Sequence, residues 1–196
     1  PKLIERHNRL AASLLAALAL ALAIALRRTG YERALRGHLG AVSVGIVEST
    51  LVLDLDLRRA QIHRRLGVAK EPGFSDYFTR REELDKLVQA TKSPNLFVLT
   101  AGALPPNPPA LIARKQMGDL LDRLRRHFDW ILVDSPPLAS VTDALLLARY
   151  CDLAVYVVQY NRVDKKAIKR SIQALQKVTP NLVGVVINAL DTKTRG

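Results

Sequence analysis

The sequence is poor in acidic residues and in cysteine. Among its 196 residues, 30 are lysine or arginine and only 18 are aspartate or glutamate, giving a formal net charge of +12 and a pI near 10.3. A chain so basic attracts anions, so the charge favours contact with a nucleotide, a nucleic acid or an acidic lipid surface without choosing among them. The single cysteine, Cys151, excludes an internal disulfide and fits a reducing compartment.

Repeats and targeting signals are also missing. The sequence shows no internal repeat and no cleavable signal-peptide pattern, and it begins at Pro1 rather than at methionine, so we expect a fragment or a processed chain. Apolar residues make up 48% of the chain, which excludes a disordered protein. Its length is enough for one domain with a sizeable core.

One long apolar run stands near the start of the chain. From Leu10 to Leu26 the only polar residue is Ser13, and Arg27 and Arg28 close the run. Alanine and leucine favour helix, so we predict either a transmembrane helix with the arginines on the cytoplasmic side or a helix buried against a sheet. We accordingly divide the chain into an apolar helix with a basic linker, residues 1–39, and a domain, residues 40–196.

The rest of the chain alternates between apolar strands and helices. The strands are apolar on both faces, which predicts an α/β fold with a mainly parallel sheet covered by helices on both faces. The expected strands are 41–47, a run from residue 51, 96–99, 130–134, 153–158 and 182–188. The expected helices are 61–66, 80–90, 111–128, 142–150 and 165–178.

Aspartates stand at the ends of two of the predicted strands. One apolar run ends in Asp54 and continues to Asp56, and a second ends in Asp134. Because side chains alternate along a strand, Asp54 and Asp56 should point the same way and repel each other unless a cation lies near. Ligands bind beyond the carboxyl ends of parallel strands, so we expect the three carboxylates around magnesium and nucleotide phosphates. Solvated acids balanced by neighbouring arginines are the alternative.

Seven short motifs occur in a fixed order over residues 50–191. They are 54–59 (DLDLRR), 61–67 (QIHRRLG), 71–76 (EPGFSD), 101–108 (AGALPPNP), 134–137 (DSPP), 142–143 (TD) and 184–188 (GVVIN). Together they resemble the bacterial tyrosine autokinases (BY-kinases) that regulate capsule and exopolysaccharide synthesis. Any one motif would be weak, because other P-loop ATPases share the aspartate strands, but the ordered set is specific.

The resemblance implies a P-loop NTPase-like fold and an ATP-dependent tyrosine kinase that uses Mg²⁺ and releases ADP. It implies that Asp54 activates the attacking tyrosine hydroxyl, that Asp56 helps to hold magnesium through water, and that Asp134 is the Walker B acid, bound to magnesium directly or through water. Asn188 would lie near the adenine. Phosphoryl transfer depends mainly on positioning and charge neutralisation, which aspartates with a metal supply.

The family also implies partners and a location. Its members act at the cytoplasmic face of the bacterial inner membrane, fused to or paired with a membrane polysaccharide co-polymerase. They autophosphorylate a C-terminal tyrosine cluster in a neighbouring subunit of a homo-oligomeric ring. For this chain we therefore expect neighbouring copies and the co-polymerase as partners, and no nucleic acid.

The sequence departs from the family at the phosphate-binding loop. The family needs Gly-x-x-x-x-Gly-Lys-Ser/Thr, whose backbone N–H groups and lysine bind the phosphates. The nearest remnant is 45–50, in which Ser49 and Thr50 take the place of the nucleotide-binding hydroxyls. Glu48 takes the place of the lysine and would repel phosphate. The C-terminal tyrosine cluster is also missing from the sequence.

Two other functions remain open. A P-loop ATPase of the partitioning or cell-division-positioning type would share the fold, and its basic helix, 165–177, could meet DNA or anionic lipid. A non-catalytic regulatory remnant of the kinase family would keep the fold and its oligomer contacts only, as the altered phosphate-binding loop suggests.

Overall fold

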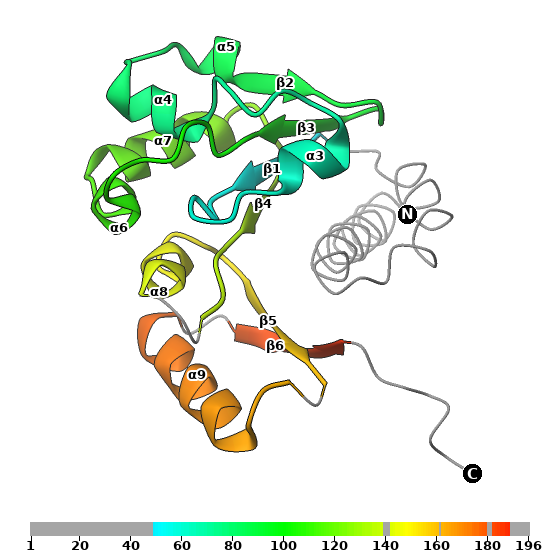
Figure 1. Ribbon diagram of the computed structural model, residues 1–196, viewed down its shortest axis with the longest axis vertical. Coiled ribbons are helices and arrows are strands. Elements are labelled where there is room, and N and C mark those ends of the chain that lie inside the picture. Colours follow the sequence, from blue (N-terminus) through cyan, green and yellow to red (C-terminus); the bar gives the residue numbers. More distant parts are fainter. Residues whose placement is uncertain (1–48, 139–141, 161, 180–181, 189–196) are drawn as a thin grey trace, which may run out of the picture.

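The computed structural model describes residues 49–138, 142–160, 162–179 and 182–188 (Figure 1). The predicted apolar helix and linker of residues 1–39, and the predicted strand 41–47, lie outside the described residues. Across the described residues, no helix is both long enough and apolar enough to cross a bilayer.

The strands form two sheets (Figure 1). In the four-stranded sheet, β1 (Thr50–Asp54) lies between β3 (Leu96–Leu99) and β4 (Trp130–Asp134) and runs parallel to both. The outer strand β2 (Val88–Ala90) is antiparallel to β3. The second sheet holds only β5 (Ala154–Gln159) and β6 (Leu182–Asn188), which are parallel. The mainly parallel α/β fold is confirmed.

Seven helices are described between these strands. They are α3 (Ile62–Leu66), α4 (Phe74–Thr79), α5 (Leu84–Leu87), α6 (Pro108–Ile112), α7 (Gln116–Arg125), α8 (Asp143–Ala148) and α9 (Lys165–Val178).

Two predicted helices are wrong in extent. The predicted helix 80–90 is the single turn α5 followed by β2, because Arg81 has a positive φ of 57° that breaks the helix and Val88 pairs with β3. The predicted helix 111–128 is two helices. The Asn107 side chain accepts the Ala110 N–H at 3.2 Å and starts α6 there, before α7 begins at Gln116.

Both faces of the four-stranded sheet are packed. Leu51 and Leu53 of β1 pack against α4, α6 and α7, whereas Val52 faces the other way and packs against Ile62 of α3. Every residue of β1 is buried. Helices therefore cover both faces, as the apolar strands predicted, and the end of β1 is held firmly in place.

Candidate functional site: the carboxyl ends of β1 and β4

Asp54 and Asp134 are the last residues of two neighbouring parallel strands. The two residues are register partners, and the Leu55 N–H donates to the Asp134 carbonyl at 2.9 Å just beyond them. Adjacent strands lie about 4.8 Å apart and register partners project from the same face, so the two carboxylates are neighbours. The structure thus brings together two of the three predicted catalytic aspartates.

The Asp54 carboxylate is oriented by the start of α3. Its Oδ2 accepts the backbone N–H of Ile62 at 3.1 Å, and the whole residue is buried. Asp134 is only partly buried and is the more accessible member of the pair. One carboxylate is therefore fixed from behind by a helix, and the other belongs to a residue that is only partly buried.

Asp56 does not lie in the strand where it was predicted. Because β1 ends at Asp54, Asp56 lies in the loop that follows, and the alternation of a strand does not set its direction. Its Oδ1 and its carbonyl oxygen both accept the Arg59 N–H, at 3.2 and 3.0 Å. The residue is nevertheless buried, two positions after Asp54.

A fourth carboxylate belongs to this edge of the sheet. Asp143 begins α8, the helix that follows β4, and its Oδ2 accepts from Nε of Arg58 at 3.3 Å. The Asp143 side chain is 2% exposed and that of Arg58 is 45% exposed. The pair joins the loops that leave β1 and β4. Both residues belong to the sequence motifs, but nothing in the sequence predicts their contact.

The acidic edge suits a nucleotide-bound cation better than a metal held by protein alone. Among the described residues, no group of three histidine, cysteine, aspartate or glutamate side chains is placed to hold a metal ion. Magnesium usually takes only one or two carboxylates and completes its shell with phosphate oxygens and water. Asp134, the register partner of Asp54 at this edge, supplies one such carboxylate.

Ser49 and Thr50 lie at the opposite end of β1. With a rise of about 3.3 Å per residue, Thr50 and Asp54 are roughly 13 Å apart along the strand. The Ser49 hydroxyl and N–H both donate to Oδ2 of Asp129, at 2.7 and 2.8 Å. The hydroxyl first, and then the backbone N–H, lower the pKa of Asp129. The structure does not bring the two hydroxyls to the aspartates, so their predicted nucleotide-binding role has no support in this geometry.

Asn188 is also separate from the aspartates. It is the last residue of β6 and pairs with Gln159 of β5, in the two-stranded sheet. It does stand at the carboxyl end of a parallel strand, as predicted, but not in the sheet that carries Asp54 and Asp134.

Two motifs that are distant in the sequence meet beside α4. The N–H groups of Phe74 and Ser75 donate to the carbonyls of Thr100 and Ala101, at 2.7 and 3.1 Å. A Cβ atom on Gly73 would lie 2.4 Å from the Gly102 nitrogen, so the two loops touch backbone to backbone. This contact explains why motifs 71–76 and 101–108 need glycine, and it anchors the loop after β3.

The chain is similar in sequence and in structure to proteins named tyrosine kinases. The chain is 33% identical over 146 residues to the tyrosine-protein kinase CpsD of Streptococcus pneumoniae serotype 4, covering 72% of this chain and 63% of CpsD. It is 32% identical over 152 residues to the tyrosine-protein kinase Etk of Escherichia coli K12, covering 78% of this chain. The solved kinase domain of Etk superposes with a TM-score of 0.72 at 30% identity, over 79% of this chain and 64% of that one.

The chain belongs to the bacterial tyrosine kinase family. No family model matches it. It spans about a fifth (21%) of the length of Etk. The cell division ATPase MinD of Pyrococcus furiosus also superposes, with a TM-score of 0.64 at 20% identity over 94% of this chain and 68% of that one. That likeness shows the fold alone, and together the neighbours confirm the P-loop NTPase-like fold.

Proposed function

We propose that this BY-kinase domain is an ATP-dependent protein-tyrosine autokinase that regulates capsule or exopolysaccharide polymerisation and export. The observation that carries the proposal is the register pairing of Asp54 and Asp134 at the carboxyl edge of the parallel sheet. Ligands of open α/β sheets bind at that edge. The names of the relatives supply the reaction class, and the motif resemblance supplies the capsule context.

In this proposal the aspartates at the edge of the sheet have two roles, proton acceptor and magnesium ligand. Asp54, oriented by the Ile62 N–H, accepts the proton of the attacking tyrosine hydroxyl. Asp134 and Asp56 would hold the magnesium ion, which would neutralise charge on the nucleotide phosphates when bound. The buried residues Leu55 and Leu57, on either side of Asp56, help to keep its carboxylate in position.

The positive charge that Glu48 fails to provide comes, in this proposal, from Arg58. Within the described residues its bond to Asp143 uses only Nε, which leaves both terminal guanidinium nitrogens available to a ligand. A guanidinium binds phosphate oxygens with two parallel hydrogen bonds, and a buried carboxylate that fixes it lowers the entropy lost on binding. Arg58 lies at the same edge as the aspartates because it follows β1 and its partner follows β4.

The wider setting is part of the same proposal. The domain acts at the cytoplasmic face of the inner membrane, in a ring of its own copies, with a membrane polysaccharide co-polymerase as partner and without nucleic acid. A neighbouring copy presents the tyrosine to be phosphorylated.

A second function, the non-catalytic remnant, is favoured by one observation. Within the described residues β4 and β5 are each paired on one side only, and no described strand leads into a glycine-rich phosphate loop. Together with Glu48, this would leave a fold that keeps its partners without binding nucleotide.

Calorimetric titration with ADP and Mg²⁺ tests the two functions. The kinase proposal expects binding that Asp134→Ala abolishes and that Arg58→Ala weakens roughly tenfold or more, about 1.4 kcal/mol. Arg126→Ala, which removes an exposed arginine from the end of α7, is the matched control and should bind like the wild type. Phosphotyrosine formation with ATP then tests transfer itself. No binding at millimolar nucleotide would reject the kinase and leave the remnant.

A further inference from the structure

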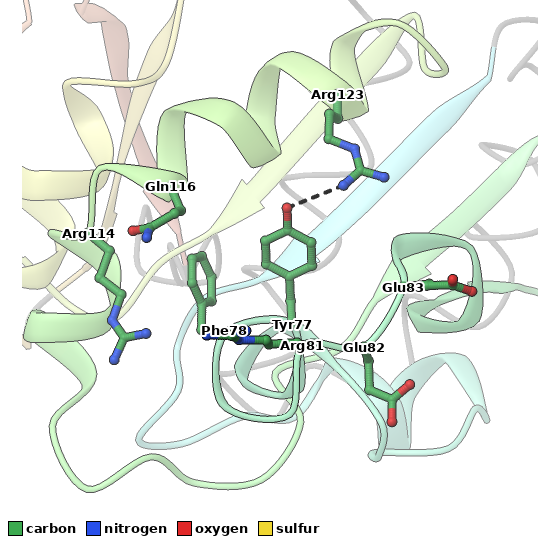
Figure 2. Close-up of a pocket in the computed structure, with 8 residues that line it drawn as sticks. All are labelled: Tyr77, Phe78, Arg81, Glu82, Glu83, Arg114, Gln116 and Arg123. Atoms are coloured by element: carbon green, nitrogen blue, oxygen red, sulfur yellow. Dashed lines mark hydrogen bonds between the residues drawn. The ribbon is translucent and has the colours of Figure 1, made fainter.

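An arginine-lined hollow lies beside α4 and α7, and it shares no lining residue with the strand-end site. Its volume is about 500 Å³, within the range of small-ligand sites. Figure 2 shows Tyr77 and Phe78 of α4 in its middle, Arg123 of α7 at one side and Arg114, from the turn between α6 and α7, at the other. Arg81, just after α4, completes the set of arginines.

These three arginines differ from others nearby in having no acidic partner. Within the part of the chain that the structure describes, no carboxylate lies within ion-pair distance of Arg81, Arg114 or Arg123. By contrast, Arg80 pairs with Asp76 at 3.3 Å, and Arg125 pairs with Asp122 at 3.0 Å. The hollow therefore gathers positive charge that the fold leaves available.

Aromatic rings position two of the three guanidinium groups. Arg114 lies over the Phe78 ring, with its Cζ 5.9 Å from the ring centre, and Arg123 Nη1 donates to the Tyr77 hydroxyl at 3.4 Å. The Tyr77 and Phe78 rings pack edge to face with centres 5.0 Å apart. Because each arginine is held by an uncharged partner, it is oriented while its charge remains free for an anion.

The acidic residues of the hollow do not cancel this charge. Glu83 forms an ion pair with Lys86 at 3.3 Å. The negative charge of Glu82 then faces the positive charges of three arginines in the lining of the hollow. Figure 2 places both glutamates at the end of the hollow away from Arg114 and Gln116. A hollow that combines positive charge with aromatic side chains fits a ligand in which a doubly negative group is attached to an aromatic ring.

We propose that this hollow binds a phosphorylated tyrosine side chain. The arginines would donate to the phosphate oxygens and the rings of Tyr77 and Phe78 would pack against the phenyl ring, a combination that phosphotyrosine offers and that phosphoserine or free phosphate lacks. The choice of phosphotyrosine rests on the proposed function, since it is the product of that reaction. The binding itself needs neither ATP nor catalysis.

Fluorescence polarisation with a labelled phosphotyrosine peptide of uncharged flanking sequence tests the proposal. We expect the chain to bind it more tightly than the unphosphorylated and phosphoserine versions. Arg114→Ala and Arg123→Ala should each weaken binding roughly tenfold, as loss of a charge-assisted hydrogen bond predicts. Arg126→Ala, which removes an equal charge outside the hollow, should leave binding unchanged. Thermal unfolding checks that each variant is folded.

Three results would overturn the proposal. Equal binding of the phosphorylated and unphosphorylated peptides would show that the phosphate is not recognised, and equal losses in Arg126→Ala and Arg123→Ala would show only diffuse charge. Inorganic phosphate that competes as well as the peptide would assign the hollow to free phosphate. Because Asp134→Ala leaves this hollow intact, retained peptide binding in that variant separates this proposal from the kinase proposal.

Discussion

The two sheets of this domain have similar apolar sequences and very different surroundings. In the four-stranded sheet, β1 has a strand on each side and helices on each face, and all five of its residues are buried. In the two-stranded sheet, Val185 is 42% and Ile187 is 55% exposed, although the strand is as apolar as β1. Residues two apart share a face, so one face of β6 is open in the described structure.

The difference shows that an apolar strand is buried only as far as its neighbours allow. The candidate site stands on the fully packed half, where the carboxylates can be held at fixed positions. Precise placement of charged groups needs such a rigid support. The more open half carries only Asn188 of the predicted site residues.

The largest difference in the free energy of unfolding should appear when one apolar side chain is truncated in each sheet. Leu53→Ala removes a fully buried side chain from β1 and should lower the free energy of unfolding by about 3 kcal/mol. Ile187→Ala, on the open face of β6, should change it by about 0.5 kcal/mol or less. Urea denaturation measures both. Equal losses would mean that the two halves are equally packed and would remove the contrast.

A second pair of substitutions adds a methyl group, once beside the four-stranded sheet and once in the two-stranded sheet. A Cβ on Gly73 would lie 2.4 Å from the Gly102 nitrogen and 2.5 Å from the Thr100 carbonyl oxygen, so Gly73→Ala must push two backbones apart and should cost about 2 kcal/mol. Gly184 of β6 has nothing within 4 Å of that position. Gly184→Ala should therefore be close to neutral in thermal unfolding, and a cost there as large as at Gly73 would contradict the open packing of β6.

The smallest change in the free energy of unfolding is expected at the amino end of β1. Ser49→Ala should lower the free energy of unfolding by about 1 kcal/mol near neutral pH, because Asp129 loses a hydrogen bond. The pKa of Asp129 is lower in the folded chain, so this stabilisation is present above about pH 4 and is lost as the pH falls through the lowered value.

Urea unfolding of the wild type and of Ser49→Ala at about pH 7 and about pH 2.5 measures this dependence. The difference between the two proteins should shrink at the lower pH. Asp129→Asn is the control, since it removes the titrating group and should make the effect of Ser49→Ala independent of pH. A difference of the same size at both pH values in the wild-type background would disprove the assignment to Asp129.

Sequence reasoning located most of the elements and part of the site. The helix 165–178 and the strands 96–99, 130–134 and 182–188 are observed as predicted, because their apolar patterns are long or clearly bounded. The helix 111–128 was predicted as one element because its apolar pattern continues across the break between α6 and α7. The break lies at residues 113–115, after α6 ends at Ile112 and before α7 begins at Gln116, and it leaves that pattern unchanged.

In the candidate site, too, local sequence patterns predicted some features and missed others. Asp54 and Asp134 could be found because each ends an apolar strand, and parallel strands bring their carboxyl ends to one edge. Ser49 was assigned from its place in a motif remnant, but it binds Asp129 at the other end of β1. The Arg58–Asp143 pair was missed because it joins residues 85 positions apart.

By itself the sequence determined the α/β class, the order of most elements and the acidic strand ends, because these follow from local apolar patterns and from the polar residue that stops each strand. Tertiary structure alone decided which strands are neighbours, which apolar residues are buried, and which charges meet. It gave Arg58 a buried carboxylate and, among the residues that the structure describes, left Arg81, Arg114 and Arg123 without one. Pairing across the sheet and the contacts between loops join distant residues, and no local pattern encodes the partner that each side chain meets.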